Sequence, residues 1–455
     1  MLSLDKIGEY VNNVCQQIRW TKAHQRVSEE LTNHVIDGRD FYIGQGVDEK
    51  KATEKAISDT GDATIIGTQL DRIHRPKPQW SMFIATAVLL MLGYIVWLFI
   101  FSLDDTRGLL PTRLLCTGIG VVGMIVAYLA DFTILGKYPK TIYFGVISIS
   151  VLLLLFSPQL NGMAYYAQYI ILLFPLAFSA IVFVTRNKGY LGIFLCGLAF
   201  VLPGFIALCV PSVSGFMQFA IIGATLLGIA IYRKWFGSNR RKSFMLMLAP
   251  VIFLVIVFLL SIGSNGWNRL AVAFNPSLDP SGAGYIGVMT REMVSGAAIF
   301  GQGYVPGEFF SVFASYKDIF YTDLLLTSAT SYLGWIAFAV IIGALFFFIV
   351  KGFISCFKQK SSLGLFTSFS IMMTFTIQAI GYITFNLGLQ FASPISLPLI
   401  SYGNVATVVN LVLIGFMLSI FRTGDVVEDE KLHIVNISNK LLHRLDKLPT
   451  SIKGK

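Results

Sequence analysis

The sequence predicts an all-α protein: a polytopic membrane bundle of about ten transmembrane helices, preceded by a small cytosolic helical domain. Its composition is 55% hydrophobic and only 13% charged, with a mean hydropathy of +0.69, whereas soluble domains carry about 25% charged residues. The apolar residues form long continuous blocks, and a block of ~20 residues is long enough to cross a bilayer. These observations exclude an ordinary soluble enzyme.

The N-terminal region, 1–80, is rich in charge and lacks a long apolar block, so it predicts a helical domain without catalysis. The first residues are polar and do not predict a cleavable signal peptide. A third helix is expected to start with Asp48 as its N-cap, to run through Ile57 and to end at Gly61. The two helices before it are indicated by apolar residues at helical spacing, which are Ile7, Val11, Cys15 and Ile18, then Val27, Leu31 and Val35.

Ten apolar spans are predicted within one membrane domain, 81–421. They are 81–102, 113–130, 141–157, 169–184, 190–210, 216–232, 244–262, 324–350, 363–384 and 401–421. Lys and Arg gather in the loops after the even-numbered spans, whereas the loops after spans three, five and nine carry none. By the positive-inside rule these basic loops and both termini are cytoplasmic in a cell membrane. The formal charge of +10 therefore sets topology and does not indicate nucleic-acid binding.

Two segments outside the spans are unusual. The predicted outside loop, 263–323, is long and contains several Pro and Gly residues, and loops of this length are usually functional. The tail, 422–455, mixes leucines with Lys and Arg and predicts a cytosolic amphipathic helix that contacts anionic lipid. The five cysteines are scattered singly, so a disulfide framework or a cysteine metal site is not expected.

A motif at the start of the last span, Leu397–Gly403, resembles the signature of the shape, elongation, division and sporulation family, which contains FtsW, RodA and SpoVE. The ten-span topology with a long loop before span eight is similar to that family as well. Further family-like residues occur in the family's order, namely Arg269, Pro276, Asp279-Pro280, Gly284-Tyr285, Gly301-x-Gly303, Thr322-Asp323, Leu333-Gly334, Gln378 and Gly388.

The resemblance implies a peptidoglycan glycosyltransferase. Such an enzyme polymerises lipid II into glycan strands at the outer face of the cytoplasmic membrane, during cell division, elongation or sporulation, and releases undecaprenyl pyrophosphate. The resemblance also implies a class B penicillin-binding protein as partner, together with other division or elongation proteins. Region 1–80 resembles prefix domains fused to some permeases. No cofactor is fixed by the sequence, although a divalent cation such as Mg²⁺ or Mn²⁺ is one means of stabilising a pyrophosphate.

Asp323 is the candidate catalytic base, because the family's Thr-Asp pair carries the aspartate regarded as catalytic. We expect it at the outer mouth of span eight, where partial desolvation raises the pKa of a carboxyl group. The alternative is a structural aspartate that caps this span. Weaker candidates for the base in the same loop are Asp279, Glu292, Glu308 and Asp318.

Substrate-binding candidates come from the long loop and from polar residues near it. Arg269, Arg291 and Lys317 are the basic residues of the loop and suit a pyrophosphate. The other candidates are Thr322, Gln378, Ser401, Tyr402 and Tyr166. Structural alternatives stay open for these residues: solvated cations, a local Arg291–Glu292 salt bridge, contacts between helices for Gln378, and interfacial aromatic rings for Tyr165 and Tyr166. Gly301 and Gly303 suit a tight turn or a phosphate cradle.

Several polar residues of the family are replaced here. The family's Gln-Pro-Ser-Glu motif corresponds to Phe174–Ala177, Ser331-Tyr332 stands where the family has two glutamates, and Tyr382 replaces an asparagine. These changes favour a rival hypothesis, a non-catalytic relative that scaffolds wall-synthesis enzymes or moves lipid-linked precursors across the membrane. The retained Thr322-Asp323 pair favours the enzyme, and the scarcity of charges within the spans opposes ion-coupled transport.

Overall fold

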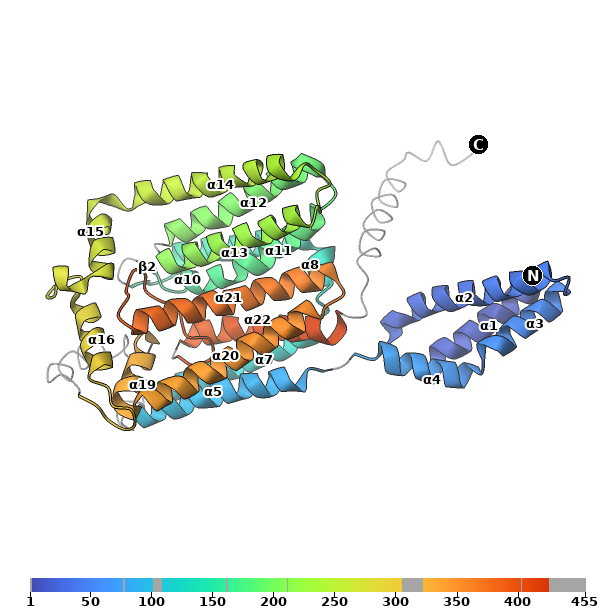
Figure 1. The fold of residues 1–455 in the computed structure, drawn as a ribbon, viewed down its shortest axis with the longest axis horizontal. Coiled ribbons are helices and arrows are strands. Elements are labelled where there is room, and N and C mark those ends of the chain that lie inside the picture. The colour runs from blue at the N-terminus through green and yellow to red at the C-terminus, as the bar shows by residue number, and fades with distance from the viewer. Residues whose placement is uncertain are drawn as a thin grey trace. The chain divides into compact units, whose positions relative to one another are not determined.

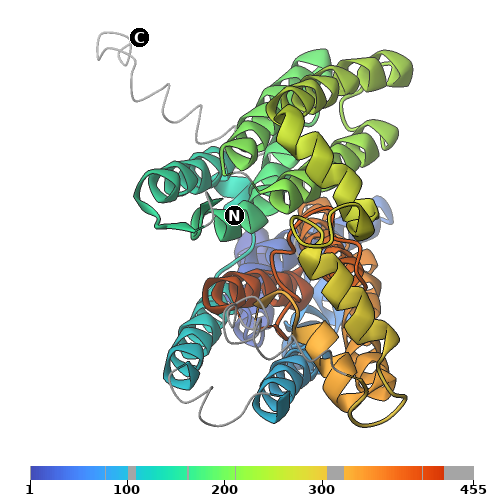
Figure 2. The same ribbon diagram turned by 90° about the vertical axis from the view of Figure 1, so that its left-hand side faces the viewer.

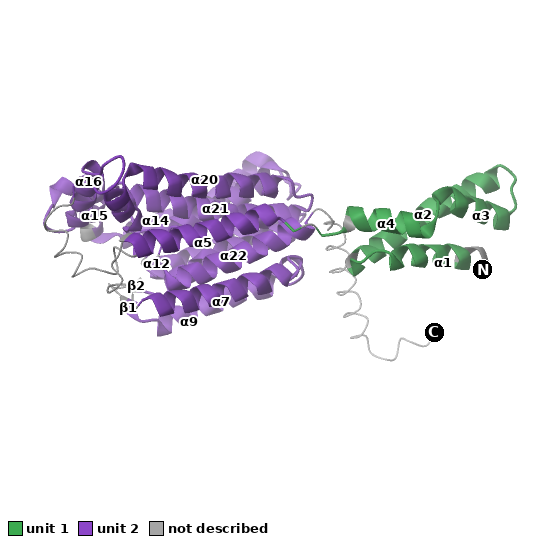
Figure 3. Cartoon of the chain, turned by 90° about the horizontal axis from the view of Figure 1, so that it is seen from below, with its two compact units in different colours: residues 1–78 green, residues 79–455 purple. Residues whose placement is uncertain are grey.

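The computed structural model describes residues 2–76, 78–100, 109–160, 163–210, 212–304, 322–401 and 403–424. The chain divides into two compact units, Met1–Pro78 and Gln79–Lys455 (Figure 3). The predicted all-α fold class is confirmed, since the strands in the described parts are a single two-residue pair, β1 (Gln159–Leu160) with β2 (Met163–Ala164). The predicted tail helix lies outside the described residues.

The N-terminal unit is built from four helices: α1 (Leu2–Gln16), α2 (Thr21–Gly44), α3 (Glu49–Thr60) and α4 (Ala63–His74). All seven apolar residues that indicated the first two helices are buried in its core. Ile18 follows the end of α1, and the other six lie on one face of each helix because residues three or four positions apart share a face. The spacing of apolar residues therefore predicted this part of the fold correctly.

The turn between α3 and α4 differs from the prediction in one respect. Gly61 ends α3 as expected, with a φ of 103° that an L side chain rarely adopts. Asp48 is the N-cap residue of α3, as predicted, but its side chain makes no cap hydrogen bond. The capping carboxylate is Asp62, which accepts hydrogen bonds from the backbone N–H groups of Thr64 at 2.8 Å and Ile65 at 3.2 Å. It begins α4, a helix that was not predicted from the sequence.

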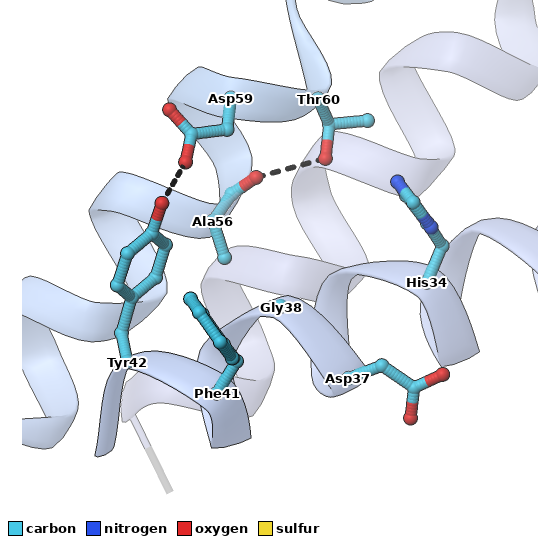
Figure 4. A pocket seen from close by; sticks show the side chains of 8 residues that line it. All are labelled: His34, Asp37, Gly38, Phe41, Tyr42, Ala56, Asp59 and Thr60. Carbon is cyan, nitrogen blue, oxygen red and sulfur yellow. Dashed lines mark hydrogen bonds between the residues drawn. The ribbon is translucent and has the colours of Figure 1, made fainter. Parts of the chain in front are cut away.

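A pocket of about 210 Å³ lies between α2 and α3, with His34, Asp37 and Phe41 among its lining residues (Figure 4). The Tyr42 hydroxyl donates a hydrogen bond to the carboxylate of Asp59 at its rim. The Asp59 carboxylate therefore already has a hydrogen-bond partner within the protein. The pocket is a surface recess between the two helices.

Ten helices of the described chain are long and apolar enough to cross a membrane (Figure 1). In chain order they are α5 (Trp80–Ile100), α7 (Leu110–Leu129), α9 (Pro139–Phe156), the continuous α10 (Ala167–Ile170), η1 (Ile171–Leu173) and α11 (Phe174–Val184), then α12 (Gly189–Cys209), α13 (Val213–Tyr232), α14 (Arg240–Ser261), α20 (Trp335–Phe357), α21 (Ser362–Asn386) and α22 (Asn404–Thr423). A short helix, α8 (Ile134–Lys137), connects α7 with α9.

Helix starts follow local sequence signals. Proline occupies the first turn of α7, α9 and α11, where its missing N–H has no intrahelical partner to lose. The side chains of Ser212, Asn239 and Ser361 accept hydrogen bonds from the first-turn N–H groups of α13, α14 and α21. The chain thus satisfies some of the backbone donors that each helix leaves open at its start.

The membrane unit buries two apolar cores. One is centred on α5 and α19 to α22, and the other on α9 and α11 to α13 (Figure 2). Helix α11 serves both, since Leu176 faces the first core and Phe178 the second. In contrast α14 is largely exposed, with Ile252, Phe253 and Ile256 pointing outward. In a chain of ten apolar spans, such a surface faces lipid.

Span eight is shorter than predicted. The predicted span, 324–350, is two helices: α19 (Leu325–Leu333) is a separate short helix, and the membrane helix α20 begins only at Trp335. Gly334 divides them with a φ of 90°, and a Cβ at this position would lie 2.6 Å from the carbonyl oxygen of Ile299. The expectation that Asp323 stands at the mouth of a continuous span eight is therefore wrong.

The described part of the long loop lies across one end of the bundle as α15 (Gly263–Phe274), η2 (Pro276–Leu278) and α16 (Tyr285–Ser295) (Figure 1). Asp279 shapes the turn before α16, because its carboxylate accepts the N–H of Ala283 at 2.8 Å and its carbonyl accepts the N–H of Gly284 at 2.9 Å. A Cβ on Gly284 would lie 2.1 Å from the carbonyl oxygen of Pro276, so this turn requires glycine.

The two aspartates before helices α3 and α4 provide a matched test of the N-terminal unit. We expect Asp62→Ala to destabilise α4 by about 1 kcal/mol, which corresponds to roughly fivefold faster opening, because a capping acceptor is lost. Asp48→Ala should leave α3 nearly unchanged. Hydrogen-exchange mass spectrometry on the intact protein, comparing peptides from the two helices, measures both; equal effects of the two variants would contradict the capping assignment.

Candidate active site

Asp323 lies directly before α19, at the end of the bundle that α15 and α16 cover (Figure 1). Its side chain is half-buried, and the hydroxyl of Thr322 hydrogen-bonds to it. Burial raises the pKa of Asp323 to about 7, with the Thr322 contact opposing part of that rise. Leu324, not Asp323, is the residue that caps α19, so the side chain does not act as a helix cap. A carboxyl group with this pKa exchanges a proton near neutral pH.

The backbone around Asp323 is held by one face of α21. The Tyr382 hydroxyl donates to the carbonyl oxygen of Thr322 at 2.8 Å and accepts the N–H of Leu325 at 3.2 Å. One turn further along α21, the amide nitrogen of Asn386 donates to the carbonyl oxygen of Asp323 at 2.8 Å. Both side chains are buried. They satisfy polar backbone groups that would otherwise lie without partners in an apolar bundle.

Asn386 also fixes the first turn of α19. Its amide oxygen accepts hydrogen bonds from the backbone N–H and the hydroxyl of Thr327, both at 2.9 Å. This amide therefore contacts the chain on both sides of the start of α19. The position of the Asp323 carboxylate depends on α21, a helix that lies close to it in space but about sixty residues later in sequence.

The Leu397–Gly403 motif also contacts Tyr382. Ser401 is buried, and its hydroxyl accepts the N–H of Leu397 at 2.9 Å and lies beside the Tyr382 hydroxyl. Leu399 lies in the left-handed region with a φ of 66°, a conformation that costs about 1–3 kcal/mol for a residue other than glycine. The motif is thus a strained turn that ends before α22 begins at Asn404. Tyr402 lies outside the described residues.

Two other family-like stretches pack against each other through their backbones. The N–H groups of Gly301 and Gly303 donate to the carbonyl oxygens of Leu333 and Ser331 at 3.1 and 2.9 Å. A Cβ at Gly303 would lie 2.4 Å from the carbonyl oxygen of Gly296. These glycines therefore serve close backbone packing at the end of α19, and their N–H groups are not directed at a phosphate.

The three candidate cations of the loop have different surroundings. Arg269 is exposed on α15. Arg291 donates to the carbonyl oxygens of Gly388 and Phe274, each at 3.1 Å, so it joins α16 to the last residue of α15 and to the segment that follows α21. These bonds occupy its guanidinium in place of the expected Glu292 contact. Lys317, like Glu308 and Asp318, lies outside the described residues.

Gln378 faces the interior of the bundle and not the Asp323 carboxylate. It forms a buried polar group with Asn410 of α22 and Ser396, at distances of 3.4 to 3.5 Å. The polar residues Gln378, Tyr382 and Asn386 follow each other at intervals of four on α21 and share one face. This face joins α21 to α22 at one end and to the start of α19 at the other.

Aromatic residues lie near Asp323. Tyr169 of α10 is buried within electrostatic reach of Asp323, and its ring packs edge-on against that of Tyr165, with the centroids 5.5 Å apart. The ring centroids of Tyr165 and Tyr166 are 5.2 Å apart, and Tyr166 is 40% exposed. The expected aromatic pair therefore extends from the site to the surface, with Tyr169 as a member that was not predicted from the sequence.

Residues 79–425 match the sequence model of the FtsW, RodA and SpoVE cell cycle protein family. The chain belongs to this family. A probable peptidoglycan glycosyltransferase FtsW of Trichlorobacter lovleyi is 24% identical over 46% of this chain and 58% of its own length. Another of that name, from Geobacter sp. (strain M18), is 24% identical over 66% of this chain and 83% of its own. This family member thus spans little more than half the length of the first of these relatives.

Solved structures show the same fold for the membrane unit of this family member. One solved structure is of a peptidoglycan synthase complex and is described as showing the structural coordination of polymerization and crosslinking. A chain of that complex superposes on this chain with a TM-score of 0.56 and 16% identity. That match covers 76% of this chain and 98% of the other. The rod shape determining protein RodA of Thermus thermophilus gives a TM-score of 0.50 at 14% identity, over 76% of this chain and 97% of its own.

Asn386 was absent from the sequence-based candidates, and its role is testable. We expect Asn386→Ala to destabilise the protein by about 2–4 kcal/mol, because it leaves several buried donors and acceptors without partners. Asn275→Ala, the same change at an exposed position with no side-chain cap bond, should have little effect. Thermal unfolding of detergent-purified protein compares the two variants; equal melting temperatures would contradict the assigned role.

Proposed function

We propose that this family member is a peptidoglycan glycosyltransferase that polymerises lipid II into glycan strands, with undecaprenyl pyrophosphate as the leaving group. The observation that supports this most directly is Asp323, a half-buried carboxylate with a pKa of about 7, whose backbone is fixed by α21. A base poised near neutral pH at a rigid site is what proton abstraction from a sugar hydroxyl requires.

We propose that Asp323 faces the outside of the cytoplasmic membrane. The basic loops after the even-numbered spans lie at the end of the bundle opposite α15, α16 and α19 (Figure 1). The positive-inside rule assigns that basic end, and with it both termini, to the cytoplasm. The site is then on the side where glycan strands are assembled.

In the proposed step, the oxygen of an attacking sugar hydroxyl forms a bond to the anomeric carbon of a second, lipid-linked sugar. The bond from that carbon to the pyrophosphate breaks, and lipid pyrophosphate departs with the bonding electron pair. The Asp323 carboxylate accepts the proton of the attacking hydroxyl. Such positioned bases contribute typically ~10²–10⁴ in rate. The aromatic side chains of Tyr165 and Tyr166 offer a stacking surface for a sugar ring beside it.

Arg269 is the described cation that we assign to the departing pyrophosphate, because it is exposed and its guanidinium suits phosphate oxygens. Arg291 contributes by fixing the loop through carbonyl bonds, and Lys317 remains a sequence-based proposal. Among the described residues no three His, Cys, Asp or Glu side chains gather as a metal site. The proposed step assigns no part to a divalent metal ion.

We also propose a class B penicillin-binding protein as partner, which would cross-link the strands that this enzyme makes. One solved relative is a chain of a synthase complex in which polymerization and crosslinking are coordinated, and this likeness supports the proposal. A non-catalytic scaffold is the alternative, and one observation favours it. Where the family has a polar motif, Phe174, Leu176 and Ala177 of this chain are buried in apolar cores.

The deciding experiment is polymerisation of labelled lipid II by the purified protein, alone and with a candidate partner, with and without Mg²⁺ or Mn²⁺. We expect Asp323→Asn to lower the rate at least ~10²-fold, because the amide cannot accept the proton. Asp279→Asn, which keeps an acceptor for the turn before α16, should polymerise normally. If the wild-type protein makes no polymer with any partner while it remains folded, the scaffold is correct; if Asp323→Asn stays active, another base is used.

The pH dependence provides a separate test. A base must be ionised to act, and burial raises the pKa of Asp323 to about 7. The polymerisation rate should therefore rise with pH, with a half-maximal point near 7, and at pH 6 it should be about a tenth of its plateau. A rate that is flat from pH 5 to pH 8 would show that no group with this pKa limits the reaction.

A further inference from the structure

A buried arginine lies in the first turn of α7 and has no part in the site described so far. Arg113 is only 6% exposed. Its guanidinium carbon is 4.3 Å from the ring centroid of Tyr94 and 5.0 Å from that of Trp97, both on α5. Ionisable side chains inside membrane spans are costly and rare, and those that persist mark functional positions. The two aromatic faces offset part of this cost.

The guanidinium also contacts the strained turn of the Leu397–Gly403 motif. The Nη2 atom of Arg113 donates to the carbonyl oxygen of Ile400 at 3.3 Å. Ile400 follows Leu399, the residue in the left-handed conformation, and precedes Ser401. Arg113 therefore holds the turn at a peptide group between the residue that carries the strain and the serine that contacts Tyr382.

Helix α5 supports the same peptide from another direction. A Cβ at Gly93 would lie 2.5 Å from the carbonyl oxygen of Ile400, so the backbones of α5 and the turn are in direct contact. Tyr94, the next residue, hydrogen-bonds to the hydroxyl of Thr117 at 2.8 Å, which joins α5 to α7 beside the arginine. A strained backbone conformation persists only where surrounding contacts hold it in place. The contacts of the Ile400 peptide with Gly93 and Arg113 provide this support beside Leu399.

We propose that Arg113 is a positioning residue for the proposed glycosyl transfer: it holds the Ile400 carbonyl so that Ser401 and Tyr382 keep the backbone of Asp323 in place. The path is continuous, from Arg113 to Ile400, through Ser401 to the Tyr382 hydroxyl, and from there to the carbonyl of Thr322 and the N–H of Leu325. The expected effect on the reaction rate rests on the proposed function. The expected effect on the backbone around Asp323 rests on the described contacts.

The kinetic test compares Arg113→Met and Arg113→Lys with wild type in lipid II polymerisation. We expect kcat to fall about 100-fold in Arg113→Met, the size of loss that small misplacements of a catalytic group produce. Arg113→Lys keeps the cation and should recover part of the activity. The KM should stay within about twofold, and the half-maximal pH should stay near 7. A raised KM with unchanged kcat would show that Arg113 binds substrate instead, and wild-type kinetics in Arg113→Met would also overturn the proposal.

Two further variants separate positioning from general loss of structure. Gly93→Ala displaces the Ile400 peptide without touching the arginine and should reproduce the fall in kcat. Arg240→Met removes another arginine that lies over an aromatic ring, 4.9 Å from the Tyr232 centroid, and should behave as wild type. A Gly93→Ala protein with full activity would contradict the role of the turn.

Hydrogen exchange keeps the inference testable if the wild-type protein does not polymerise lipid II, an outcome that would refute the proposed function alone. Peptides from 322–333 and 397–401 should exchange faster in Arg113→Met and Gly93→Ala than in wild type or Arg240→Met. Unchanged exchange in 322–333 would refute the path from Arg113 to Asp323, whatever the enzymatic activity.

Discussion

The hydrogen bonds from one face of α21 to the chain around Asp323 are the constraint on which the site depends. Non-helical backbone inside a membrane bundle is tolerated only where protein groups or water satisfy its polar atoms. The segment between the long loop and α19 is such a backbone, and Tyr382 and Asn386 supply its partners. Without them the carboxylate of Asp323 would have no fixed position relative to the rest of the bundle.

The same kind of contact occurs at two positions where the sequence resemblance implies other polar residues. Tyr382 contacts both the Thr322 carbonyl and Ser401. Ser331 donates to the backbone carbonyl of Met293 at 3.3 Å. At both positions the side chains bind the backbone of neighbouring segments, and these contacts hold the segments in place.

The sequence predicted the features that periodicity and composition control. The membrane spans, the helices at Ile7–Ile18 and Val27–Val35, and the end of α3 at Gly61 follow from apolar spacing and from glycine's backbone freedom. It did not predict the break at Gly334, because 324–350 contains no charged residue and the close backbone contact between Gly334 and Ile299 cannot be recognised from the sequence. The carbonyl contacts of Arg291 and the role of Asn386 were not predicted, because the partners of both side chains include backbone groups distant in sequence. The spacing of Gln378, Tyr382 and Asn386 at intervals of four was the sequence pattern that could have predicted the polar face of α21.

The break at Gly334 has a mechanical consequence. Membrane helices tilt as bilayer thickness changes, at a modest cost per ångström of mismatch. Helix α20 is a membrane span of this kind, and it begins at Trp335, whose N–H is bound to the carbonyl oxygen of Ala298. Helix α19 is instead attached to α21 through Thr327 and Asn386. Because Gly334 interrupts the helix, α19 and α20 are not one rigid rod, and a tilt of α20 in the bilayer is not carried to Asp323 along a continuous helix.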